Sequence, residues 1–105
     1  MKISILLPYK ENFSSIYAGA VSLFVKDTTK ISKYRKSITV YGNTELKDIY
    51  KLSYKNIFLK KTLIESGSKL YVNKFLKFES TNPSDIIEIH NRPNYFHLIH
   101  DKKKN

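Results

Sequence analysis

Apolar and polar residues divide this chain into short alternating blocks. The first block is an unbroken apolar run, residues 3–7, which Pro8 closes. Because it lacks regular polar alternation, the run is typical of a strand buried on both faces of a parallel sheet. A polar loop follows, and apolar residues then recur at helical spacing, which predicts a helix with one stripe on the sheet. That stripe consists of Ala20, Val21, Phe24, Val25 and Thr28.

The same alternation continues through the middle of the chain. Residues 37–41 predict a second strand, which the turn pair Gly42-Asn43 ends. Residues 45–55 fit either a short helix or an irregular connection, whereas residues 57–59 predict a third strand. A second helix begins near residue 66 and has an apolar face. That face comprises Tyr71, Phe75 and Phe78, with Val72 and Leu76 beside it.

The fourth predicted strand ends abruptly in polar side chains. Asn82-Pro83 stops the preceding helix, because the residue before a proline is pushed out of helical geometry. Residues 86–89 include three isoleucines, whose β-branched side chains suit a largely buried strand, and His90 and Asn91 follow at once. In open α/β sheets, ligands bind beyond the carboxyl ends of the strands, so this loop is a candidate wall of a binding site. The alternative is that His90 and Asn91 only cap the turn into a further helix over residues 95–100.

The predicted order is strand, helix, strand, strand, helix, strand, helix. Such alternation predicts an α/β fold, a Rossmann-like parallel sheet with helices on both faces. By analogy with doubly wound folds, the first strand is central and the fourth lies beside it, so the loops with Gly19 and His90 meet at one edge. We expect one domain over residues 1–101 and a disordered basic tail over residues 102–105, which has nothing to bury.

Gly19 lies in the first turn of the first predicted helix, where glycine costs up to about 1 kcal/mol relative to alanine. Two interpretations stay open. Either the backbone approaches an anionic ligand, which free N–H groups and the helix dipole favour, or the glycine permits tight packing of helix on sheet. The sequence around Gly19 is neither a P-loop nor a G-x-G-x-x-G fingerprint.

The net charge of +10 comes almost entirely from lysine. Seventeen of the nineteen cations are Lys, spread over nearly the whole chain, and only Arg35 and Arg92 are Arg. Proteins that read bases or phosphates directly depend on the planar fork of Arg, so diffuse lysine favours a solvated surface over a nucleic-acid stripe. The charge still favours attraction to anionic membrane surfaces and to nucleotide-bearing substrates.

The residue composition argues against thiol chemistry and against a metal site. The chain has no cysteine, which excludes a disulfide framework, a thiolate metal site and a thiol nucleophile. His97 and His100 could share a helix face, but two ligands without a carboxylate in register make a weak metal site, so we expect no metal. No apolar run approaches the roughly 20 residues of a membrane span. Tyr9, Lys10 and Glu11 stand where a signal peptide would be cleaved, so we expect a cytoplasmic protein that could contact the inner face of the membrane peripherally.

Two motifs in the chain resemble the N-terminal domain of family 4 glycosyltransferases of the GT-B fold. The first is Lys2-Ile-Ser-Ile-Leu-Leu-Pro8, followed by Glu11-x-Phe13-Ser14 and Gly19-Ala20-Val21-Ser22. The second and more specific motif is the stretch 83–93, which resembles the fourth strand and its following loop. The resemblance covers nearly the whole chain and is weakest between residues 44 and 65.

The resemblance implies a retaining transfer of sugar from a nucleotide-sugar donor, in a cleft between two Rossmann-like domains. It implies that Gly19 and Ala20 approach the donor diphosphate and that His90, as the catalytic residue, lies near the transferred sugar. It also implies that Asn91 and Arg92 shape the acceptor side. The nucleotide-sugar is a co-substrate, and no further cofactor is implied.

Two departures from the family pattern change this expectation. Glu88 stands where many members have another histidine, so its role stays open. The second domain, which supplies most nucleotide contacts in the family, is absent from these 105 residues. We therefore expect a fragment or a truncated reading frame: the acceptor-side part of a hexosyltransferase of polysaccharide biosynthesis, inactive alone. The alternatives are a small basic α/β module that binds nucleic acid or another polyanion, and a non-catalytic remnant.

Overall fold

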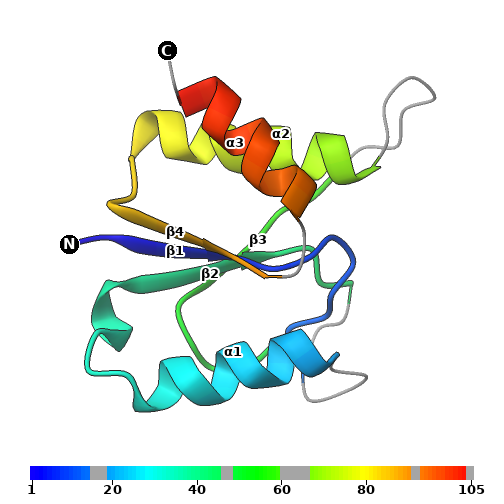
Figure 1. Ribbon diagram of the computed structural model, residues 1–105. Coiled ribbons are helices and arrows are strands. Elements are labelled where there is room, and N and C mark those ends of the chain that lie inside the picture. Colours follow the sequence, from blue (N-terminus) through cyan, green and yellow to red (C-terminus); the bar gives the residue numbers. More distant parts are fainter. Residues whose placement is uncertain (15–18, 46–48, 60–66, 91–92, 104–105) are drawn as a thin grey trace.

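Within the part of the chain that the structure describes, four parallel strands form the sheet around which the helices are arranged (Figure 1). The computed structural model describes residues 1–14, 19–45, 49–59, 67–90 and 93–103. The strands lie in the order β3-β2-β1-β4. Their bounds are Ile3–Leu6 for β1, Ile38–Gly42 for β2, Tyr54–Asn56 for β3 and Ile86–Ile89 for β4. The predicted Rossmann-like parallel sheet is therefore confirmed.

The order of the strands reverses at β1. From β1 the sheet extends to β2 and β3, and the chain then returns to the other side of β1 to form β4. Leu6, the last residue of β1, pairs with Tyr41 on β2 and with Ile89 on β4. The loops after these three strands therefore start at the same edge of the sheet. The predicted adjacency of the first and fourth strands is confirmed, and such a reversal is where doubly wound folds bind ligands.

Helices cover both faces of the sheet, as predicted (Figure 1). Helix α1 (Ala20–Ile31) lies on one face, and helices α2 (Gly67–Thr81) and α3 (Pro93–Lys103) lie on the other. A short 3-10 turn, η1 (Arg35–Ser37), leads into β2. Proline suits the first position of α3, since its missing N–H would have no partner within the helix there.

The buried apolar residues that the structure describes form two cores, one on each face of the sheet. The core on the α1 side consists of Ile5, Leu7, Phe13, Val25, Ile38 and Val40. The other core consists of Leu6, Tyr41, Ile57, Tyr71, Val72, Phe75, Tyr95 and Ile99. Successive residues of β1 alternate between the two cores, because successive side chains of a strand point to opposite faces. The strand is thus buried on both faces, as its unbroken apolar run predicted.

The third strand lies three residues before its predicted place. The prediction was residues 57–59, but β3 is Tyr54–Asn56. Ile57 is fully buried, and its N–H donates to the carbonyl of Gly42 at 2.7 Å. Phe58, the next residue, is 71% exposed and lies outside the strand. The apolar triplet therefore marks the end of this edge strand and not its centre.

The side of α1 that contacts the sheet also differs from the prediction. The buried residues of the helix are Ser22, Val25 and Thr29. Ala20, Phe24 and Thr28, which were predicted to face the sheet, are exposed. The helix has apolar residues on two sides, and periodicity alone does not determine which side is buried. The solvent-exposed side of α1 therefore carries more large apolar side chains than is expected of a helix face in water.

For two other segments, the structure decides between predicted alternatives or moves a predicted boundary. Of the alternatives for residues 45–55, the described residues 49–53 form an irregular connection with an isolated bridge from Ile49 to Ser14. Helix α3 extends to Lys103, two residues into the predicted disordered tail. Residues 104 and 105 lie outside the described part.

Candidate functional site

His90 directly follows β4, at the edge where the strand order reverses. Its side chain is only 18% exposed. The ring packs edge-on against Phe24 of α1, with the two ring centroids 5.9 Å apart. His90 therefore lies on the α1 side of the sheet, fixed by an aromatic contact between two elements that are distant in sequence.

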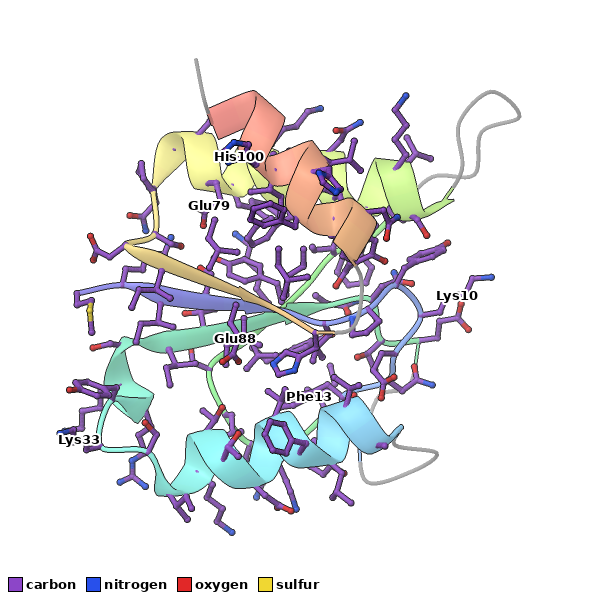
Figure 2. All side chains as sticks on the ribbon, viewed as in Figure 1. Lys10, Phe13, Lys33, Glu79, Glu88 and His100 are labelled. Carbon is purple, nitrogen blue, oxygen red and sulfur yellow. The ribbon has the colours of Figure 1, made fainter. Side chains whose placement is uncertain are left out.

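Glu88 holds the His90 ring as well. Nε2 of His90 lies 2.8 Å from Oε2 of Glu88, because side chains two apart on a strand share a face. Figure 2 shows Glu88 on the α1 side of β4. A proton on Nε2 donates to the carboxylate, which leaves Nδ1 as an acceptor while the ring is neutral. Glu88, whose role stayed open from the sequence, therefore contacts the His90 ring directly.

The amino end of α1, where Gly19 and Ala20 lie, is occupied by a carboxylate of the chain itself. Oε2 of Glu11 accepts a hydrogen bond of 3.1 Å from the backbone N–H of Ser22. Gly19 is the N-cap residue of α1, and because it has no side chain, it cannot itself cap the helix. A Cβ on Gly19 would lie only 1.9 Å from Oε2 of Glu11, so the close approach of the carboxylate requires glycine. The helix dipole favours an anionic group at this end, and here that group is Glu11.

Gly19 and His90 belong to the same region of the α1 side. Gly19 precedes Phe24 by five residues, about 7.5 Å along the helix axis, and Phe24 contacts His90. The strands that lead into the two loops, β1 and β4, are neighbours. The two residues therefore lie at one edge of the sheet, as the predicted adjacency of the first and fourth strands implied, whereas Asn91 and Arg92 lie outside the described residues.

Lys10 adds a cation to the loop after β1. It lies in a turn that closes with a 3.1 Å hydrogen bond from the N–H of Glu11 to the carbonyl of Pro8. Its φ angle is 65°, a left-handed conformation that costs on the order of 1 kcal/mol for a residue with a side chain. Strained backbone of this kind is common at ligand sites. Nothing in the sequence singled out Lys10, whereas Glu11 belonged to the first resembling motif.

Two tyrosines, Tyr71 on α2 and Tyr95 on α3, fix the same loop from the other face of the sheet. The N–H of Tyr9 donates to the hydroxyl oxygen of Tyr95 at 3.0 Å. The hydroxyl of Tyr71 donates to the carbonyl of Leu7 at 2.6 Å. Burial, ahead of the neighbouring tyrosines, raises the pKa of Tyr71 well above 10.0. The fold thus stabilises the neutral phenol, which anchors the start of the β1–α1 loop.

The remaining histidines and a hollow beside α3 lie apart from this edge. His97 and His100 are exposed on α3, and among the described residues no three His, Asp or Glu side chains could together hold a metal ion. A hollow of about 210 Å³ lies between β4 and α3, lined by Ile87, Ile89, Phe96, Ile99 and His100. It lies on the face of β4 opposite Glu88, so it contains none of the predicted site residues.

Comparison of the chain with protein-family models, with curated proteins and with solved structures finds no match. Function therefore has to be argued from the fold and from the contacts at the carboxyl edge. Among the described helices, none is both long and apolar enough to cross a membrane.

Proposed function

We propose that this chain is the N-terminal, acceptor-side part of a retaining glycosyltransferase of the hexosyltransferase type. It would take part in the transfer of a sugar from a nucleotide-sugar donor to a glycan or lipopolysaccharide-type acceptor. The observation that supports the proposal most is the position of His90, after β4 at the reversal of a Rossmann-like sheet. Glu88 and Phe24 fix its ring, and a polar group held at a ligand edge suits the recognition of substrate hydroxyls.

His90 is the residue that we assign to the reaction centre. With Nε2 engaged by Glu88, Nδ1 can accept a hydrogen bond from a sugar hydroxyl. Asn91 and Arg92 would contact the acceptor. Lys10, exposed in the loop after the neighbouring strand, supplies positive charge for the donor phosphates. We assign no role to a metal ion, and we place the reaction in the cytoplasm, at the inner membrane face for a lipid-linked acceptor.

A donor diphosphate would compete with Glu11. Backbone N–H groups near Gly19 and Ala20 would bind the diphosphate, yet the Glu11 carboxylate already accepts the N–H of Ser22. Two anions at one helix end repel each other, so Glu11 has to move before a diphosphate binds there. Donor binding is therefore reduced by the free energy of this charged cap, about 1 kcal/mol.

Saturation-transfer NMR with uridine and guanosine diphosphate sugars tests the proposal on the full chain. We expect dissociation constants of about 1 mM, because a few hydrogen bonds act against the lost freedom of the ligand. His90→Gln should weaken binding about tenfold through the loss of one hydrogen bond. Glu11→Gln should strengthen binding about fivefold, because the competing charge is removed. His97→Gln, exposed on α3, is the matched control and should leave the affinity unchanged.

Two results would contradict these assignments. If His90→Gln binds as tightly as the parent protein, His90 does not contact the ligand. If Glu11→Gln binds no better than the parent, the diphosphate lies elsewhere than at Gly19 and Ala20.

The second candidate is a small basic α/β module that binds nucleic acid or another polyanion, which the net charge of +10 favours. Binding through phosphate contacts weakens steeply with salt. An affinity for duplex or single-stranded nucleic acid that falls at least about tenfold between roughly 50 and 200 mM salt would favour this candidate. Binding without salt dependence would count against it.

A further inference from the structure

The side of α1 that faces away from the sheet carries exposed apolar residues. Ile31 is 85% exposed and Leu23 is 47% exposed. They lie about two helical turns apart, on the same side of the helix. Tyr34, in the turn that follows α1, is 46% exposed. Large apolar side chains in solvent, on a helix that already buries its other side, indicate a second contact surface on α1.

Cations surround these apolar residues. Together they form what we call the outer surface of α1, which consists of Leu23, Lys30, Ile31, Lys33, Tyr34, Arg35 and Lys36. All seven residues are exposed. The sequence from Thr28 to Thr44 contains no Asp or Glu, and Asp27 forms an ion pair of 3.0 Å with Lys26. The outer surface of α1 is therefore both apolar and cationic. Asp27, which is exposed between Leu23 and Ile31 on the same side of the helix, is paired with Lys26 and adds no net charge to it.

This surface lies away from the candidate ligand edge. Figure 2 shows Lys33 and Lys10 at opposite ends of the molecule. Lys33 follows the carboxyl end of α1, whereas the loop with Lys10 precedes its amino end. A partner that covers the outer surface of α1 would therefore leave the carboxyl edge of the sheet open.

We propose that the outer surface of α1 docks on an anionic lipid membrane. Its cations would bind the lipid headgroups, while Leu23, Ile31 and Tyr34 enter the boundary between headgroups and acyl chains. A second copy of the chain fits less well, because two such surfaces would bring like charges together. Nucleic acid would engage the cations but would leave Ile31 in water. The inference is independent of sugar transfer, since it uses none of the residues at the carboxyl edge.

Flotation with lipid vesicles tests this docking on the full chain. Vesicles of phosphatidylcholine with roughly one third phosphatidylglycerol should bind the protein, and vesicles of phosphatidylcholine alone should not. The double variant Lys33→Gln/Lys36→Gln should bind about 30-fold more weakly, since each cation near an anionic surface contributes about fivefold. Lys69→Gln/Lys77→Gln removes the same charge from two exposed positions on α2, on the opposite face of the sheet (Figure 1), and should bind like the parent.

A second pair of variants, Ile31→Gln and its control Phe96→Gln, tests the contribution of apolar side chains to membrane binding. Ile31→Gln should weaken vesicle binding by at least about fivefold, because an apolar side chain no longer enters the lipid boundary. Phe96→Gln changes an exposed aromatic residue on α3 and should have no effect. Circular dichroism melting of each variant shows that the fold is retained.

Several outcomes would overturn the inference. Absence of binding to the anionic vesicles would do so directly. If both double lysine variants lose vesicle binding equally, the lipid is bound by the diffuse charge of the whole protein. If Ile31→Gln binds vesicles as well as the parent does, Ile31 does not enter the bilayer. Binding of duplex DNA that depends on Lys33 and Lys36, together with weak binding of vesicles, would identify the surface as a nucleic-acid site.

Discussion

Glu11 and Gly19 act as a pair at the start of α1. Oε2 of Glu11 accepts the N–H of Ser22 and so satisfies one of the N–H groups that every helix leaves without a partner at its amino end. Gly19 leaves the space that this carboxylate occupies. The stabilisation that either residue provides therefore depends on the other.

A double-mutant cycle measures this dependence. Gly19→Ala should destabilise the protein by about 1–2 kcal/mol, because the new Cβ displaces the Glu11 carboxylate and α1 loses its cap. Glu11→Ala should cost about the same. The double variant should cost little more than either single change, because the second substitution removes an interaction that is already lost. Urea unfolding of the four proteins gives the values, and additive losses would mean that the two residues act independently.

Replacing Lys10 by glycine should raise the stability of the fold but weaken ligand binding. Lys10→Gly should stabilise the fold by up to about 1 kcal/mol, because glycine adopts a φ of 65° without strain. It should also weaken the binding of nucleotide diphosphates, because a cation is lost. Lys10→Gln is the control, which loses the charge but keeps the strained backbone. Thermal unfolding and ligand titration separate the two effects, and a Lys10→Gly protein less stable than the parent would argue against strain.

Tyr71 predicts how stability responds to alkaline pH. Its pKa in the folded protein lies well above 10.0 because of burial, whereas the unfolded chain titrates near the ordinary value. The unfolded state thus binds fewer protons above pH 10, so the contribution of Tyr71 is complete below that pH and is lost as pH rises further. Tyr71→Phe should be less stable by about 1–2 kcal/mol at neutral pH, because the Leu7 carbonyl loses a buried partner.

The same variant should lose less of its stability than the parent between about pH 9 and pH 11. Denaturant unfolding at a series of pH values measures the difference. Parallel pH profiles for the two proteins would show that Tyr71 is not the group responsible.

At the scale of the element, a buried carboxylate ties the end of α2 to the sheet. Glu79 is only 3% exposed and lies between α2 and the sheet (Figure 2). It accepts hydrogen bonds from the backbone N–H of Ser84 at 2.9 Å and from the hydroxyl of Ser84. Its Oε1 also lies 3.4 Å from Oγ of Ser4 on β1. One residue thus joins α2, β1 and the segment that leads into β4.

Glu79→Ala should destabilise the protein by about 2–4 kcal/mol, because the buried hydroxyl of Ser4 and the part-buried donors of Ser84 lose their acceptor. Glu88→Ala, an exposed change on β4, should alter stability by about 0.5 kcal/mol or less. Chemical denaturation of both variants measures the contrast. A loss as small as that of the control would mean that the serines find other acceptors.

The positions of most elements could be predicted from local signals, but the exact place of β3 and the directions of the side chains on α1 could not. Asn82-Pro83 and the isoleucines of β4 are strong local signals, so the end of α2 and the fourth strand were predicted correctly. On α1, Ser22 is buried and Phe24 is exposed, because the choice between two apolar sides depends on the sheet. The burial of Glu79 could not be predicted from the sequence either, since its partners Ser4 and Ser84 lie outside α2.

At the scale of the whole molecule, the strand order determines which loops meet. Of the order β3-β2-β1-β4, the central first strand with the fourth beside it was predicted, by analogy with doubly wound folds, and this adjacency brings the loops with Gly19 and His90 to one edge. Glu11 and Lys10 were not predicted as members of that edge. Their positions depend on a tight turn with a left-handed residue, and lysine gives no local signal for such a turn. The edge at which Gly19 and His90 lie could therefore be predicted from the sequence, but the presence of Lys10 and Glu11 at that edge could not.

The most direct test of the candidate edge is the place where a nucleotide-sugar binds on the protein. Titration of the full chain with uridine diphosphate glucose, followed by two-dimensional amide NMR, maps that place residue by residue. We predict the largest shift changes in the loops after β1 and β4, at Lys10, Gly19 and His90. Changes confined to Lys33 and Lys36, on the outer surface of α1, would show that the nucleotide follows the basic surface and would contradict a ligand site at the strand reversal.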